Sequence, residues 1–94
     1  MSLQTDQVTR PAEFVTGTAV AEVARAAEGA GFDAVFVTEH PFPEDAWLAS
    51  GGHHALDPFV ALTAAACATT TLRVLSNLCV VPYRNPFLLA KAAL

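Results

Sequence analysis

Apolar residues first follow a helical period along this chain and then run continuously. Between Thr18 and Ala30 they recur every three or four residues, at Ala19, Val23, Ala26, Ala27 and Ala30, which is the spacing of one face of an amphipathic helix. Gly31 is placed to end that helix, because the residue just past a helix often has a positive φ that glycine adopts without strain. The apolar run 34–37 follows at once and predicts a strand covered on both faces, as in a parallel sheet.

The same plan returns further along the chain. Asp57 and Pro58 combine a side-chain acceptor with a proline at the first helical position, which is a strong helix start. The predicted helix runs to the threonines at 69–71, whose β-branched side chains favour its end. Residues 72–81 are predicted to form the longest strand, which Pro82 ends.

Other segments give weaker signals. Residues 3–8 alternate loosely between apolar and polar and could form an initial strand. Pro11 could start a helical turn, although Gly17 then interrupts the pattern. Residues 41–57 read as a long loop rich in proline and glycine, and such loops are usually functional or disordered. Trp47 within it favours an ordered loop.

The order of elements predicts an α/β fold. Asn85 and Pro86 repeat the helix-start signature, so the chain reads β-α-β-loop-α-β-α, a parallel βαβαβα segment in which the crossovers place the strands side by side. This order suits a doubly wound sheet or part of a (β/α)₈ barrel, which takes about 250 residues. Because Leu94 falls inside the last predicted helix, residues 1–94 are expected to be a single segment, the N-terminal part of a larger domain.

Composition narrows the class of protein. The 94-residue chain is 53% hydrophobic and 15% charged, with a formal charge of −4, so a sizeable buried core is expected. The few basic residues lie singly, which argues against nucleic acid. The apolar runs are too short for a membrane span, and no secretory signal is recognisable, so a cytoplasmic location is expected. Cys67 and Cys79 are expected to be buried, reduced thiols.

Two ionisable residues, Glu39 and His40, follow the strand predicted at 34–37. Ligands of parallel α/β proteins bind at the carboxyl ends of strands, and a histidine beside a carboxylate can accept or donate a proton near neutral pH. Pro41 restrains His40 to extended geometry. The alternative is a solvated polar pair that opens a loop. Arg84 could equally bind an anion or simply be exposed.

Other chemistries find less support in the sequence. The glycine-rich loops of nucleotide-binding folds and the nucleophile elbow of hydrolases are missing. A metal-dependent hydrolase is a weak alternative, because six side chains of ligand type lie close together in the sequence without the spacing typical of zinc sites. No metal is therefore expected at these residues, which are Glu39, His40, Asp45, His53, His54 and Asp57.

Four segments, taken in order, resemble the luciferase-like monooxygenase superfamily from about Ala19 to the end of the chain. They are Gly-Phe-Asp-Ala-Val-Phe-Val-Thr-Glu-His, Asp-Pro-Phe-Val-Ala-Leu-Thr-Ala-Ala-Ala, Leu-Arg-Val-Leu-Ser-Asn-Leu and Pro-Tyr-Arg-Asn-Pro-Phe-Leu-Leu-Ala-Lys. Within the superfamily the chain most resembles the branch that uses the deazaflavin coenzyme F-420, and relatives that use reduced FMN share the same segments.

The resemblance implies a (β/α)₈ TIM barrel with the cofactor across the carboxyl ends of its strands, and hydride transfer between the cofactor and a small-molecule substrate. It implies that His40 is the catalytic residue near the reacting centre and that Glu39, where deazaflavin relatives have aspartate, lies near the cofactor. On the next strand it implies a bulge with a non-prolyl cis peptide behind the ring, best matched by Leu78-Cys79 with Asn77 beside it, so these three residues are expected to bind the cofactor.

Three functional hypotheses follow. The first is an oxidoreductase that uses coenzyme F-420, with an FMN-dependent monooxygenase as the close alternative. The second is a truncated, non-catalytic chain that associates with copies of itself or with the remainder of a barrel, because an isolated piece of barrel exposes sheet edges and apolar surface. A homo-oligomer is accordingly expected. The third is the metal-dependent hydrolase.

Overall fold

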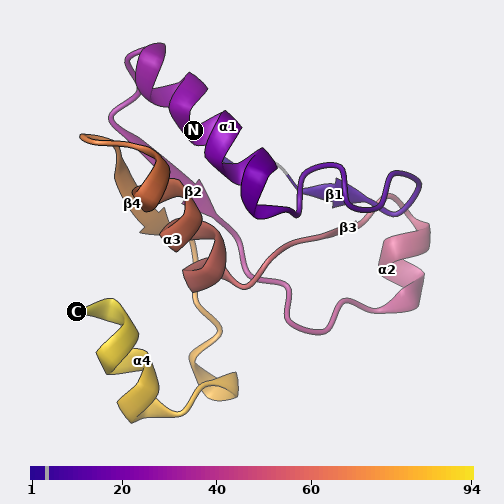
Figure 1. Ribbon diagram of the computed structural model, residues 1–94. Coiled ribbons are helices and arrows are strands. Elements are labelled where there is room, and N and C mark those ends of the chain that lie inside the picture. The colour runs from indigo at the N-terminus through magenta and orange to yellow at the C-terminus, as the bar shows by residue number, and fades with distance from the viewer. Residues whose placement is uncertain (4) are drawn as a thin grey trace.

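The computed structural model describes residues 1–3 and 5–94 (Figure 1). Its extents are 39 × 34 × 18 Å, so the molecule is thin in one direction. The elements in chain order are β1 (Asp6–Gln7), α1 (Gly17–Gly29), β2 (Ala34–Val37), α2 (Asp45–Ala49), β3 (His53–His54), α3 (Pro58–Ala68), β4 (Arg73–Ser76), the 3-10 turn η1 (Val81–Tyr83) and α4 (Pro86–Ala93).

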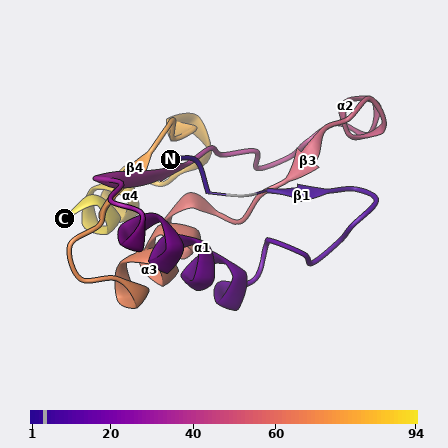
Figure 2. The same ribbon diagram turned by 90° about the horizontal axis from the view of Figure 1, so that it is seen from above.

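A parallel pair of strands forms the centre of the fold. β2 and β4 pair in register from Ala34 opposite Arg73 to Val37 opposite Ser76. On the other side of β2, Ser2 forms a parallel bridge with Phe36. Helices α1 and α3 lie together against one face of this sheet (Figure 2). The mixed α/β class with a parallel sheet is therefore confirmed.

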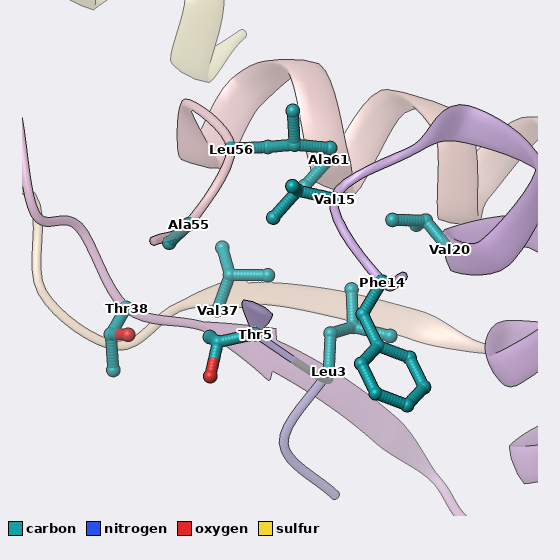
Figure 3. Close-up of a pocket in the computed structure, with 10 residues that line it drawn as sticks. All are labelled: Leu3, Thr5, Phe14, Val15, Val20, Val37, Thr38, Ala55, Leu56 and Ala61. Carbon is teal, nitrogen blue, oxygen red and sulfur yellow. The ribbon is translucent and has the colours of Figure 1, made fainter. Parts of the chain in front are cut away.

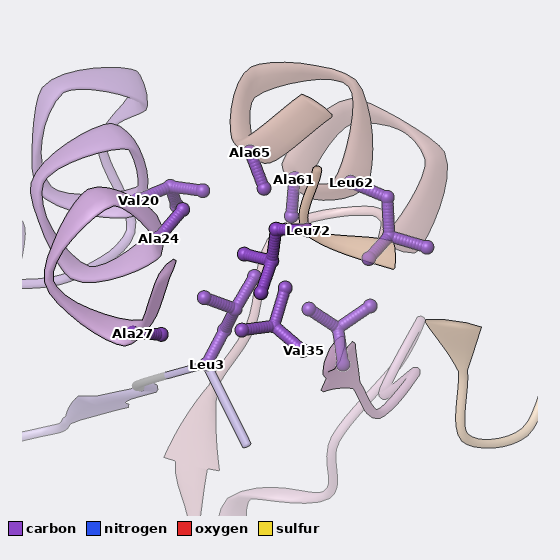
Figure 4. Packing of buried hydrophobic residues seen from close by; sticks show 10 residues of the cluster. Leu3, Val20, Ala24, Ala27, Val35, Ala61, Leu62, Ala65 and Leu72 are labelled. Carbon is purple, nitrogen blue, oxygen red and sulfur yellow. The ribbon is translucent and has the colours of Figure 1, made fainter. Parts of the chain in front are cut away.

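Small side chains let the two helices pack closely over the sheet. The buried residues of α1 are Val20, Ala24 and Ala27, so the predicted stripe was wrong in phase by about one position and only Ala27 of that set is buried. The alanines of α1 lie all around the helix, and the apolar period therefore does not define one face. The buried cluster, shown in Figure 4, comprises Leu3, Val20, Ala24, Ala27, Val35, Val37, Ala61, Leu62, Ala65 and Leu72.

The predicted helix boundaries are mostly confirmed. Gly31 has φ +84°, and the Gly31 and Phe32 amides donate to the carbonyls of Glu28 and Ala27, both at 3.0 Å, which is the Schellman arrangement. The Asp57 and Asn85 side chains cap α3 and α4, each followed by proline. The helical turn expected at Pro11 is absent from the residues described, and Thr16 caps α1 through the Ala19 amide instead.

Glu28, at the end of α1, fastens the loop before β4. One oxygen of its carboxylate accepts hydrogen bonds from the backbone amides of Thr70, Thr71 and Leu72 at 2.9, 2.6 and 3.1 Å, and the two threonine hydroxyls also donate to it. These bonds, first of all those from Thr71, lower the pKa of Glu28 to about 2. The α3–β4 loop is therefore tied to the end of the neighbouring helix.

Two predicted strands differ from the observed ones. The strand expected at 72–81 ends at Ser76, because Leu78 has φ 109° and cannot continue an extended ladder. β2 is half-buried rather than buried at Ala34 and Phe36, so only the helix-facing side of this strand is fully covered. The strand expected at 3–8 is divided: the Leu3 amide donates to the Phe36 carbonyl, β1 pairs with β3, and Gln4 lies outside the described residues.

The long loop between β2 and α3 is ordered. It contains the short helix α2 and the strand β3, which pairs antiparallel with β1. This ribbon extends away from the main sheet and carries α2 near its far end (Figure 2). Cys67 is exposed and Cys79 half-buried, so the expectation of two buried thiols was wrong; both are free thiols. Within the described ranges, no helix is long and apolar enough to cross a membrane.

Candidate functional site

A cleft of about 400 Å³ opens where β2 ends. Its walls come from two segments that lie far apart in the sequence, the one that follows β2 and the one that follows β4. The lining consists of aromatic, proline and acidic side chains together with one valine: Glu39, His40, Pro41, Phe42, Pro43, Glu44, Trp47, Val80 and Tyr83. The predicted pair Glu39 and His40 therefore lies in a cleft, at the carboxyl end of a parallel strand.

Three rings form a cluster around His40. The centroid of the His40 ring lies 5.0 Å from that of Trp47 and 4.8 Å from that of His53, and Trp47 and His53 are 5.0 Å apart. His40 follows β2, Trp47 lies on α2 and His53 on β3. The cluster therefore fixes the His40 imidazole against the ordered part of the loop.

A second aromatic pair joins the two sides of the cleft. Phe42 and Tyr83 meet edge to face with their ring centroids 5.6 Å apart. Both side chains are otherwise exposed, so a ligand in the cleft can reach their surfaces.

The Glu39 carboxylate is buried and fully engaged. One oxygen accepts a hydrogen bond from the Val80 amide and the other from the Arg84 guanidinium. Burial acts to raise the pKa of Glu39, but the bonds from Arg84 and Val80, the positive charge of Arg84 and a bond from Cys79 outweigh it and hold the pKa below its ordinary value. Glu39 is therefore an ionised anchor between the ends of two strands.

Arg84 links Glu39 to the start of α3. Its Nη2 also lies 2.6 Å from an Asp57 carboxylate oxygen, while the other Asp57 oxygen caps α3. The guanidinium carbon lies 4.9 Å from the centroid of the Phe59 ring. Bonds to Glu39 and Asp57 raise the pKa of Arg84 above its ordinary value. The sequence left two alternatives for Arg84, an anion contact or an exposed side chain. The structure shows neither: Arg84 is half-buried and pairs with Glu39 and Asp57 of the same chain.

The other predicted cofactor residues lie beside the cleft rather than in its lining. The Asn77 amide donates to the Val37 carbonyl at 2.8 Å and extends the parallel ladder, while its side chain is exposed. Leu78 is 63% exposed, and Cys79 lines a different groove, formed with α3 and α4. The expectation of a cis peptide bond at Leu78-Cys79 was wrong, because the peptide bonds of the described residues are all trans.

The candidate metal ligands do not form a cluster of three or more among the described residues. Among residues 1–3 and 5–94, no three histidine, cysteine, aspartate or glutamate side chains lie close enough together to hold a metal ion. His53 is half-buried in the aromatic cluster, whereas His54, next to it on β3, is exposed. Adjacent side chains of a strand point to opposite sides, which explains why these two diverge.

A second hollow lies on the helix side of the sheet. It is lined by Leu3, Phe14, Val20, Val37, Leu56 and neighbours (Figure 3) and holds about 10 Å³. That is about the space of one water molecule, and the walls are mostly apolar. This hollow is therefore a small packing gap in the core.

Sequence reasoning missed most of the cleft wall. Trp47 was used only as a sign of order, and Val80 and Tyr83 were not assigned a role. A signal was present: Tyr83 and Arg84 directly precede the Asn85-Pro86 helix start, and helix starts lie at the same edge of a parallel sheet as the strand ends.

Comparison with known proteins places this geometry in a family. The family model for luciferase-like monooxygenases matches residues 2–94. No curated protein and no solved structure matches the chain significantly. Because the match extends over nearly the whole sequence, the chain belongs to the luciferase-like monooxygenase family.

Proposed function

We propose that the cleft beside His40 is the active site of an oxidoreductase that transfers hydride between coenzyme F-420 and a small-molecule substrate, with reduced FMN as the alternative cofactor. Family membership implies an oxidoreductase in general. The proposal extends to the architecture: β2, α3, β4 and α4 are successive units of a (β/α)₈ barrel. The observation that carries it is the position of His40, in an aromatic cleft at the carboxyl end of a parallel strand.

The cleft suits the planar ring of such a cofactor. Its volume of about 400 Å³ falls in the usual range of ligand pockets, about 300 to 1,000 Å³. Flat side chains, Phe42, Trp47 and Tyr83, contribute much of its surface, and aromatic rings stack favourably on one another. When bound, the ring supplies hydride chemistry, as an acceptor or a donor.

The chain's own residues would hold and protonate the reactants. His40 lines the cleft and is the group suited to give or take a proton near neutral pH. Trp47 packs against His40 and helps to exclude water from it. Glu39 acts through the fold, because both of its oxygens already accept bonds from Val80 and Arg84. We propose that the exposed Asn77 and Leu78 side chains meet the outer edge of the ring, and that Cys79 acts on the cofactor site only through its bond to Glu39.

Trp47 provides a direct binding assay. It is the only tryptophan of the chain and it lines the cleft, so a ring bound there should quench its fluorescence. We expect saturable quenching when the full chain is titrated with F-420, and weaker quenching with reduced FMN. The reverse order would favour FMN. Absence of quenching by both, together with unchanged cofactor fluorescence, would refute the proposal.

A matched pair of variants tests the role of His40. We expect His40→Gln to bind the cofactor with similar affinity but to lose about 10²-fold or more in turnover, which is the usual contribution of a general acid or base. His54→Gln, an exposed histidine on β3, is the control and should keep full turnover. Unchanged turnover in His40→Gln would remove its proposed role.

A second candidate function is self-association with a second copy of this chain. It is favoured by the large apolar side chains exposed on β4, on η1, on the segment between them and on α4, which are Leu75, Leu78, Val81, Phe87 and Leu88. Contiguous exposed apolar surface commonly marks an interaction site. Sedimentation of the purified chain should show a dimer or larger species that Phe87→Ser and Leu88→Ser disrupt. A monomer at all concentrations would exclude it.

A further inference from the structure

His53 contacts His40 but has no part in the function proposed above. It lies on β3, where its Cα partner is Gln7 of β1. The half-buried His53 ring meets His40 at 4.8 Å between centroids, with the two planes at 86°. The same ring meets Trp47 at 5.0 Å and 64°. His53 is therefore a wall of the cluster that contains the proposed catalytic imidazole.

The local backbone is adapted to hold this cluster. A Cβ on Gly52 would lie 2.7 Å from two ring atoms of Trp47 and from its carbonyl oxygen. The Gly52 amide donates to that carbonyl at 2.9 Å. Only glycine therefore lets the indole lie against the residue that precedes His53, and the rings of Trp47 and His53 are held at one distance from each other.

The surroundings of His53 disfavour a second positive charge. Burial, then the proximity of His40 and of His54, lowers the pKa of His53 below its ordinary value of 6.5. The paired strand β1 brings one carboxylate, Asp6, which is engaged by the Phe14 and Val15 amides. The ionisable groups of the elements around His53 are His40, His54, Asp6 and, at the start of α2, the exposed Glu44 and Asp45.

We propose that His53 is a positioning residue of the site: its ring fixes the plane of the His40 imidazole, and the contact between the two rings makes a second protonation of the pair unfavourable. Two imidazolium rings in contact repel each other, so protonation of one suppresses protonation of the other. His40 lines the cleft, so an imidazole held in one plane there presents its ring nitrogens to a bound substrate in a fixed direction. The catalytic consequence rests on the proposed function; the coupling between the two rings does not.

The coupling can be measured without a cofactor. A protonated imidazole quenches tryptophan fluorescence on contact, and Trp47 touches both rings. In the full chain we expect quenching on acidification to spread over a wide pH range, with a Hill slope below about one, as coupled sites require. His53→Phe keeps the ring contact and should restore a single transition with a slope of about one. His54→Gln, at the neighbour on the opposite face of β3, removes a smaller repulsion on His53; it should shift the midpoint slightly but keep the broad transition.

Stability supplies a second readout. Since the pKa of His53 is lowered in the folded chain, the unfolded chain binds more protons below about pH 6.5, and folding stability falls as the pH drops through that range. His53→Phe and His53→Gln should both remove this loss. If His53→Phe does not fold, the pH dependence of the stability of His53→Gln tests the proposal in its place.

Folded variants that titrate as broadly as the unmodified chain would overturn the proposal. So would the failure of both His53 variants to fold while His54→Gln folds, since His53 would then be a purely structural residue. Cofactor titration separates this from the proposed function: restored single-step titration without any cofactor binding would sustain the coupling and refute the oxidoreductase site.

Discussion

Removing Arg84 should destabilise the chain far more than removing an exposed arginine of the same kind. In Arg84→Met the aliphatic stem is kept but the Glu39 carboxylate, 6% exposed, loses its counter-ion. Leaving one partner of a buried ion pair uncompensated costs about 3 to 5 kcal/mol. The Arg84 side chain is 19% exposed, so some water can reach the vacated position. We therefore expect Arg84→Met to lower the free energy of unfolding by about 3 kcal/mol, the low end of that range.

The surface pair of Arg10 and Glu13 is the matched control. Its atoms lie 3.4 Å apart and its side chains are 69% and 39% exposed, and exposed pairs contribute about 0 to 1 kcal/mol. The free energies of unfolding of Arg84→Met and Arg10→Met, measured in urea and compared at the same denaturant slope m, should therefore differ by at least about 2 kcal/mol. Equal losses in the two variants would refute the reasoning.

A double-mutant cycle isolates the pair. Glu39→Gln should cost less than Arg84→Met, about 1.5 kcal/mol, because Arg84 keeps its bond to Asp57. Adding Glu39→Gln to Arg84→Met should cost little more, since a neutral amide replaces the uncompensated charge. The coupling energy should reach at least about 1 kcal/mol. The lowered pKa of Glu39 gives stability that is present above its ordinary value of 4.5 and is lost as the pH falls through the folded value.

Three further substitutions test other parts of the structure. Glu28, whose pKa is lowered to about 2, contributes stability that is present above its ordinary pKa of 4.5 and is lost as the pH falls towards 2; thermal unfolding of Glu28→Gln should show lower stability at neutral pH and a weaker pH dependence in this range. Gly52→Ala should displace the Trp47 indole and shift its emission to longer wavelength, whereas Gly29→Ala, with open space around its Cβ, should leave emission unchanged and add about 0.5 to 1 kcal/mol. Leu78→Gly should raise the unfolding midpoint, because φ 109° strains leucine but not glycine; a lower midpoint would mean that its side chain is packed.

The helix starts were predictable because their signals are local. Asp57-Pro58 and Asn85-Pro86 each place the acceptor and the proline within two residues, so no distant contact is needed to recognise them. The face of α1 was not predictable in the same way. Alanine occurs on every side of this helix, and the choice of Val20, Ala24 and Ala27 for burial is made by α3, which the local pattern does not contain.

The strand lengths depended on contacts that lie far apart in the sequence. Residues 78–81 are apolar, and apolarity alone extended the predicted strand through them. The chain instead turns at Leu78, and its Val80 amide donates to Glu39, 41 residues away. β1 and β3 are two residues long each, too short for any periodicity, and their pairing could not have been read from either segment alone.

The site was half predictable for the same reason. Glu39 and His40 follow a clear strand, and their position alone assigns them to the carboxyl edge of the sheet. Trp47 and His53 reach His40 through a loop whose short elements have no strong sequence signal. Local sequence patterns do not predict the ring cluster, because contacts between the rings are set by the path of the loop.

The ion pair of Glu39 and Arg84, beside the cleft, follows from the way βα units are joined. A strand ends and the next helix begins at the same edge of a parallel sheet, so residues just after strands and just before helices must converge there. Glu39 follows β2, Asp57 precedes α3 and Arg84 lies two residues before α4. Two carboxylates gathered at one edge repel each other unless a cation lies between them, and Arg84 is the cation placed to do so. Because Asp57 also caps α3, a change that moves the Arg84 guanidinium away from Asp57 should loosen the first turn of that helix, and amide exchange at Phe59 and Val60 should report it.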